Sequence, residues 1–221
     1  MKDNEELLLK ACDLVISPGT VSGFLPARML IDCPSARAEE NRTVFSDRGT
    51  FIIAGLFHDP TIPSLDYWEE GSSTPGDREL ARILKTVCTW FGSEHGIDAT
   101  VIPYQITDGG IYLKDAAVLA GLGVMGRNNL VLVPGFGPRV RFRAAWVDLE
   151  TERSIVPDTP VPCTGCVQVC MSTCPMGAFP GGRYSRALCM ERMNSDKEGA
   201  VVTGGAVDHC RVCEVDCPGW G

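Results

Sequence analysis

Two cysteine-rich runs near the C-terminus constrain this chain more than any other feature. The first run reads CTGCVQVCMSTCP and ends at Pro175, and the second reads CRVCEVDCP and ends at Pro218. One further cysteine, Cys189, lies between the runs, so that residues 163–217 contain eight cysteines. Eight thiolates are the number that two four-iron clusters need. A fold that uses them in this way must bring cysteines that are distant in the sequence close together in space.

The spacing of the runs predicts which cysteines act together. In two-cluster ferredoxins, the last cysteine of each run ligates the cluster of the other run. Applied here, this rule predicts two ligand sets that cross between the runs. The first set is Cys163, Cys166, Cys170 and Cys217, and the second set is Cys174, Cys189, Cys210 and Cys213. Two such 4Fe–4S clusters close together would form a path for single electrons.

Other uses of these cysteines remain open at this point. Structural zinc sites also use CxxC pairs, although they do not require the proline that follows each run. A disulfide framework needs an oxidising compartment and usually a small chain. The first run departs slightly from the common iron–sulfur spacing, because three residues and not two precede Cys170. Of the three remaining cysteines, Cys88 falls in an apolar helical stretch and is expected to be a small buried hydrophobe.

Length and composition restrict the class of protein. A chain of 221 residues fits one large domain or one domain with a small appendage, and a hydrophobic content of 44% is enough for a core. The net charge of −8 and the absence of a dense Lys/Arg patch argue against nucleic-acid binding. We see no export leader and no long apolar span, so we expect a cytoplasmic protein without a membrane segment, from an anaerobic metabolism.

Hydrophobic periodicity predicts alternating helices and strands before residue 150. We therefore expect an α/β layered domain over residues 1–150 and a Pro-, Cys- and Gly-rich domain over residues 151–221. The stretch 24–48 has no clear pattern and is expected to be irregular. The expected helices cover residues 3–15, 77–94 and 113–120, and the expected strands cover residues 50–57, 98–105, 129–133 and 139–149. His58 and His95 are expected to be surface or core polar groups and not metal ligands.

A glycine-rich stretch, AGLGVMGRNN, follows the third predicted helix. Its GxGxxG spacing does not indicate a dinucleotide fold, because that motif follows a strand and opens a helix, whereas this one follows a helix and precedes a strand. Two interpretations remain. The glycines form a helix C-cap and a tight turn, or they form a loop whose amides hold polar groups of a large cofactor.

The stretch AGLGVMGRNNLVLVPGFGPRVRF, followed by cysteine runs that end in CP, resembles the cobalamin-dependent iron–sulfur reductases. This superfamily includes epoxyqueuosine reductase and the reductive dehalogenases. The segment YWEEGSSTPGDRELARIL and the spacing of Cys189 before the second run are also similar to it, and the resemblance covers roughly residues 45–221. The chain looks like a compact form that stops soon after Pro218, without the helical-repeat region that epoxyqueuosine reductases carry there.

The resemblance implies an α+β fold, with a nitroreductase-like α/β layered core and a C-terminal ferredoxin-like module that holds two 4Fe–4S clusters. It also implies that the core binds cobalamin in the base-off form. By position in the motif, the residues expected along the corrinoid are Gly121, Leu122, Gly123, Gly126, Arg127, Asn128, Asn129 and Arg141.

The proton donor is harder to place by resemblance. Epoxyqueuosine reductases have an aspartate before the glycine motif, and the corresponding region here reads ITDGGIYLKDAA. Asp108 is the nearest candidate, although our alignment places the acid of the family at Thr107. Tyr104 and Tyr112 are further candidates, because a tyrosine donates the proton in the dehalogenases.

The function implied by the resemblance is a reductase in which two clusters pass single electrons to cobalamin for reduction of a small organic substrate. The expected partners are an electron donor such as ferredoxin or flavodoxin, and a homodimer is a candidate assembly. The alternative is a non-enzymatic redox partner that binds or reductively activates corrinoid for another protein. The sequence does not choose between a small-molecule substrate and a corrinoid protein as the acceptor.

Overall fold

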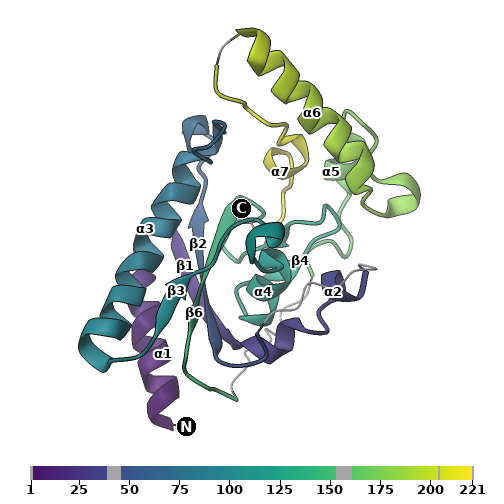
Figure 1. Cartoon of the computed structure of the whole chain (residues 1–221). Coiled ribbons are helices and arrows are strands. Elements are labelled where there is room, and N and C mark those ends of the chain that lie inside the picture. Colours follow the sequence, from purple (N-terminus) through teal and green to yellow (C-terminus); the bar gives the residue numbers. More distant parts are fainter. Residues whose placement is uncertain (1, 39–45, 153–160, 204, 221) are drawn as a thin grey trace. The chain divides into compact units, whose positions relative to one another are not determined.

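The computed structural model in Figure 1 describes residues 2–38, 46–152, 161–203 and 205–220 and shows a mixed α/β protein. The contacts of the chain divide it into two units that interleave along the sequence. The first unit comprises Met1–Leu56, Glu79–Gly123 and Arg141–Asp158, and the second comprises Phe57–Arg78, Val124–Val140 and Thr159–Gly221. The second unit therefore includes two segments that come before residue 150. The division into domains at residue 150 stays a prediction.

The first unit is built on a four-stranded sheet with the strand order β1-β2-β6-β3. Strand β1 pairs antiparallel with β2, so that Thr20 lies opposite Leu56, and β3 pairs antiparallel with β6, so that Ala99 lies opposite Val147. The β-branched and aromatic residues of these segments are typical of buried strands. The strands are β1 (Thr20–Pro26), β2 (Thr50–Phe57), β3 (Ala99–Val101) and β6 (Val140–Val147).

Two long helices, α1 (Lys2–Val15) and α3 (Pro75–Trp90), cover one face of this sheet (Figure 1). Their apolar residues recur every three or four positions, which gives each helix one apolar side. Leu8 of α1, Ile52 of β2 and Leu84 of α3 are fully buried in the resulting core. A short π-helical turn over Phe91–His95 follows α3 and ends at Gly96, which adopts a left-handed φ of 65°.

Helix α4 (Leu113–Leu119) packs on β1 and on the 3₁₀ turn Ala27–Leu30 that follows it. Phe24 faces the α1 and α3 side, so its neighbour Gly23 faces the opposite side of the strand. A Cβ at Gly23 would lie only 2.6 Å from the carbonyl oxygen of Ala120, which ends α4. Close approach of this helix end to the strand therefore depends on glycine.

The second unit has little regular structure. It contains a hairpin of two short strands, one longer helix and two helices of four residues each. These are β4 (Val124–Met125), β5 (Val131–Leu132), α5 (Val169–Ser172), α6 (Arg186–Thr203) and α7 (Val212–Val215). The remaining short elements of the chain are α2 (Pro34–Ala38) and the 3₁₀ turns Pro63–Asp66, Ile106–Asp108 and Pro180–Gly182.

The sequence predicted several elements correctly, among them the helices over 3–15 and 113–120 and the strand over 50–57. The prediction of irregular structure over 24–48 was wrong at three places, because β1 continues to Pro26, a 3₁₀ turn covers Ala27–Leu30 and helix α2 covers Pro34–Ala38. Residues 39–45 of that stretch lie outside the described residues. The predicted strand over 98–105 is much shorter, because Pro103 follows closely after Val101 and cannot donate a ladder hydrogen bond.

Gly49 offers a direct test of this packing. Its φ is 81°, and a Cβ there would lie 2.6 Å from both the indole nitrogen of Trp146 and the carbonyl oxygen of Val147. We expect Gly49→Ala to lower the free energy of unfolding by about 2–4 kcal/mol, from backbone strain plus overpacking. Urea denaturation would measure the loss. The matched control is Gly96→Ala, which has the same left-handed backbone but open space around it and should cost only about 1 kcal/mol. Equal losses for the two variants would contradict the packing argument.

Candidate metal centres at the two cysteine runs

The first predicted cysteine set surrounds one cavity in the second unit. Cys163 and Cys166 lie in the loop before α5, Cys170 lies in α5, and Cys217 follows α7, which packs against α5. The cavity has a volume of about 460 Å³. Besides these four cysteines, its lining includes Arg127, Asn128, Gln168 and Trp220.

The thiols of this set are close enough to influence one another. Burial raises the pKa of the Cys170 thiol, and the three other cysteines of the set raise it further. Burial likewise raises the pKa of Cys217, with an added contribution from Cys163 and Cys166. Because thiolates repel one another, a positive group inside the cavity would favour the ionised forms of Cys170 and Cys217.

Two backbone amides point at the sulfur atoms of this set. The Arg127 amide donates to Cys163 Sγ, and the Gln168 amide donates to Cys166 Sγ, each at 3.4 Å. Gln168 adopts a left-handed φ of 58° just before α5. Hydrogen bonds of this kind orient thiolate ligands and raise the potential of an iron–sulfur cluster.

The second predicted set also lines a single cavity. Cys174 follows α5, Cys189 lies in α6, and Cys210 and Cys213 lie before and within α7. The pKa of Cys213 is raised to about 12, first by burial and then by its three partner cysteines and Glu214. This cavity is much smaller than the first, at about 30 Å³. The two sets therefore have the same composition but line cavities of different volume.

Two residues that sequence reasoning missed support the second set. Tyr184 lines its cavity, and burial raises the pKa of this phenol, with a further contribution from its hydrogen bond with Cys189. The carboxylate of Asp196 accepts a hydrogen bond from the Cys210 amide at 2.8 Å and pairs with Arg192 at 2.7 Å. The helical spacing of Arg192 and Asp196 was visible in the sequence, but their link to Cys210 depends on the tertiary fold.

The glycine-rich stretch divides between the units, and its first part is a helix cap. Gly121 adopts a φ of 79°, its amide donates to Val118, and the Leu122 amide donates to Ala117. This pair of bonds is the Schellman motif that ends many helices at a glycine. Local structure thus explains Gly121 without a cofactor.

The second part of the stretch forms the turn of the β4–β5 hairpin. Asn129 adopts a left-handed φ of 59°, and a Cβ at Gly126 would lie 2.7 Å from Asn128 Oδ1. The buried amide of Asn128 bridges two segments, because Oδ1 accepts from the Leu130 amide and Nδ2 donates to the Cys213 carbonyl at 3.2 Å. This hairpin turn therefore touches both cysteine sets, through Arg127 on one side and Asn128 on the other.

The candidate proton donors lie in the first unit and line neither cysteine cavity. Asp108 is exposed in a 3₁₀ turn, where its carboxylate accepts from the Thr107 hydroxyl at 3.3 Å. Tyr104 is 53% exposed, and the Arg143 guanidinium lies 5.9 Å from the centre of its ring. Tyr112 is buried at the start of α4. Arg141, the last residue expected along the corrinoid, lies in β6 and is half-buried.

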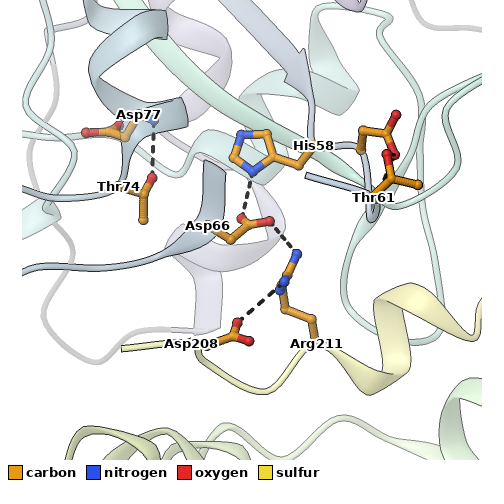
Figure 2. Close-up of polar contacts among 8 residues, drawn as sticks. His58, Thr61, Asp66, Thr74, Asp77, Asp208 and Arg211 are labelled. Atoms are coloured by element: carbon orange, nitrogen blue, oxygen red, sulfur yellow. Dashed lines mark hydrogen bonds and ion pairs between the residues drawn. The ribbon is translucent and has the colours of Figure 1, made fainter. Parts of the chain in front are cut away.

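A buried polar chain lies beside the second run, and sequence reasoning did not find it. Figure 2 shows His58 facing Asp66, and Asp66 facing Arg211, the residue that follows Cys210. His58 is 1% exposed, so the expectation of a core polar group is correct for this histidine. Arg211 and Asp66 are 145 positions apart, which is why no local pattern signals their contact.

Comparison with known proteins finds relatives by structure alone. No protein-family model matches the sequence, and no curated protein matches it. A crystal structure of an epoxyqueuosine reductase is 17% identical, with a TM-score of 0.68, and the match covers 98% of this chain and 65% of that one. For the epoxyqueuosine reductase of Streptococcus thermophilus, the identity is 19%, the TM-score 0.68, and the coverage 99% and 66%. A reductive dehalogenase described as B12-dependent is 16% identical, with a TM-score of 0.62 and coverage of 89% and 29%.

These matches show that the chain has the fold shared by epoxyqueuosine reductases and reductive dehalogenases, as the sequence resemblance predicted. It spans just under two thirds of the length of the epoxyqueuosine reductases. One of those proteins was solved with a transfer RNA stem loop, so the expectation that nucleic acid is not a partner stays a prediction. Among the described residues, no helix is long and apolar enough to cross a membrane.

The Asn128 bridge gives a prediction for the second unit. We expect Asn128→Ala to lower the free energy of unfolding by about 1–3 kcal/mol, because it removes two hydrogen bonds from a site that is only 3% exposed. Asn194→Ala, on an exposed position of α6, is the control and should change stability by less than about 0.5 kcal/mol. Thermal unfolding of both variants would measure the difference, and a neutral Asn128→Ala would show that the bridge is unimportant.

Proposed function

We propose that this protein is a corrinoid-dependent iron–sulfur reductase in which two 4Fe–4S clusters deliver single electrons for the reduction of a small organic substrate. The observation that carries the proposal is the grouping of the eight cysteines. They fall into two sets of four around two cavities, and each set combines cysteines from both runs. This is the crossed arrangement that two-cluster ferredoxins use.

The proposed cluster ligands are Cys163, Cys166, Cys170 and Cys217 for the first cluster, and Cys174, Cys189, Cys210 and Cys213 for the second. A structural zinc site would need four thiolates within about 2.3 Å of one ion. Among the described residues, no three His, Cys, Asp or Glu side chains converge on a point that could hold a single ion. The first set instead lines a cavity of about 460 Å³, which supports a multi-iron cluster over zinc at that set. The assignment of the second cluster rests on the four cysteines that line the smaller cavity and on their spacing in the sequence.

The corrinoid part of the proposal is supported by the shared fold and not by the glycines, since local backbone geometry accounts for Gly121 and Gly126. A bound corrinoid would supply the bond-breaking chemistry of the reaction. Within this chain, the residues proposed to hold it are Gly121, Leu122, Gly123, Gly126, Arg127, Asn128, Asn129 and Arg141. Asp108, Tyr104 and Tyr112 are the proposed proton donors, and a ferredoxin or flavodoxin is the proposed electron donor.

Purification without oxygen would test the proposal directly. We expect about eight irons per chain, a matching amount of sulfide, and a corrinoid absorption band that persists through gel filtration after reconstitution with cobalamin. Zinc in place of iron would overturn the cluster assignment. A protein that contained iron but did not take up corrinoid would overturn the proposal of a corrinoid-dependent reductase. Turnover of an epoxide or an organic halide by the reduced protein would then identify the substrate class.

Cysteine variants test the crossed arrangement. We expect Cys163→Ser and Cys217→Ser to remove the same paramagnetic signal, with loss of about four irons each, although these residues belong to different runs. Cys174→Ser should remove the other signal. Cys88→Ser, in α3 of the first unit, is the control and should leave both signals unchanged. Electron paramagnetic resonance of the reduced variants is the measurement. If Cys217→Ser and Cys174→Ser removed the same signal, the assignment would be wrong.

A further inference from the structure

The side chains of His58, Asp66 and Arg211 in the second unit form a buried series, in which Asp66 contacts both of the others (Figure 2). His58 Nδ1 lies 2.7 Å from Asp66 Oδ1, and Arg211 Nη1 lies 2.5 Å from Asp66 Oδ2. The exposed fractions of the three side chains are 0%, 8% and 16%. Each oxygen of the Asp66 carboxylate therefore has its own partner, which fixes the orientation of the group.

The His58 ring is itself held in place. Gly76 packs against its far side, where a Cβ would lie only 2.3 Å from Nε2. Nε2 has no hydrogen-bond partner among the residues that the structure describes, where the polar bonding of the ring goes through Nδ1 to Asp66. Because a carboxylate only accepts hydrogen bonds, Nδ1–H is the donor in the bond to Asp66. His58 thus acts as a rigid support behind Asp66.

Arg211 connects this support to the second cysteine set. It lies between Cys210 and Cys213, and its carbonyl oxygen accepts from the amides of Glu214 and Val215 at 2.9 Å, which begins helix α7. Its side chain also reaches Asp208 at 3.4 Å. The same residue therefore shapes the backbone between two cysteines, and its guanidinium, which is 16% exposed and held by Asp66, belongs to the residue that directly follows Cys210.

We propose that Asp66, positioned by His58, fixes the place and the effective charge of Arg211 and thereby sets the reduction potential of the second iron–sulfur cluster. This inference rests on the proposed function, because it needs a cluster at that cysteine set. A positive charge favours the reduced cluster, which carries one more electron, and a carboxylate that neutralises this charge has the opposite effect. His58, Asp66 and Arg211 are positioning residues that act through charge and geometry.

The two partners should shift the potential in opposite directions, which a merely structural role would not produce. In redox titrations of the holoprotein followed by electron paramagnetic resonance, we expect Arg211→Gln to lower the potential of the second cluster. Asp66→Asn should raise it, because Arg211 is then no longer neutralised. Each shift should be about a tenfold change in the ratio of reduced to oxidised cluster, which is 59 mV for one electron. The double variant should return close to the potential of the unaltered protein.

Controls separate charge from folding. Glu79→Gln and Arg82→Gln break an exposed ion pair on α3 that lines neither cavity, and they should leave both potentials unchanged. Arg211→Lys keeps the charge and should stay close to the original potential, whereas Arg211→Gln should not. Iron content and thermal unfolding are measured for each variant, so that a lost cluster is not taken for a shifted potential.

The outcomes also distinguish this inference from the proposed function. Equal potentials in Arg211→Gln and the unaltered protein, or shifts of the same sign in Asp66→Asn and Arg211→Gln, would overturn the inference while leaving two clusters in place. Loss of the second cluster in every variant, Arg211→Lys included, would assign these residues a purely structural role and overturn it as well. Failure of the unaltered protein to hold two clusters would instead refute the proposed function.

Discussion

The second unit places four cysteines around each of two cavities, in segments that have almost no regular structure of their own. Helices α5 and α7 are four residues long, well below the length at which an isolated helix is stable in water. They are held by their contact with each other and by polar contacts with earlier segments of the chain, such as the hydrogen bond from Asn128 to the Cys213 carbonyl. If the proposed clusters bind, their binding free energy adds to folding, because a preformed ligand set does not exist in the unfolded chain.

The first unit is stabilised in a different way. Its sheet is covered by two amphipathic helices, and residues such as Leu8, Ile52 and Leu84 form a continuous apolar core. The close approach of α4 to β1 at Gly23 adds a steric requirement to this hydrophobic one. Such a core needs no ligand to form, so the two units differ in what holds them together.

Polar groups connect the early segments of the second unit to its cysteine runs. Asn128 reaches the Cys213 carbonyl from the hairpin, and Asp66 reaches Arg211 from the 3₁₀ turn that it ends. Both contacts are largely buried, so each lost hydrogen bond leaves an unsatisfied group and costs more than a surface contact would. Loops that carry ligands can therefore be positioned accurately without long helices or strands.

The sequence by itself determined the helices and strands with strong periodicity, as in residues 3–15 and 50–57, because apolar spacing is a local property of the chain. The spacing of the cysteines also predicts which of them ligate the same cluster; that assignment stays a prediction, and the structure places each predicted set around its own cavity. Local pattern explained Gly121 as a helix cap, which was one of the two interpretations open from the sequence. Only the tertiary structure decided that His58, Asp66 and Arg211 form one buried chain, and that Asn128 joins the hairpin to the second run. The physical reason is that these hydrogen bonds join residues up to 145 positions apart, and no periodicity or spacing in a sequence records such a contact.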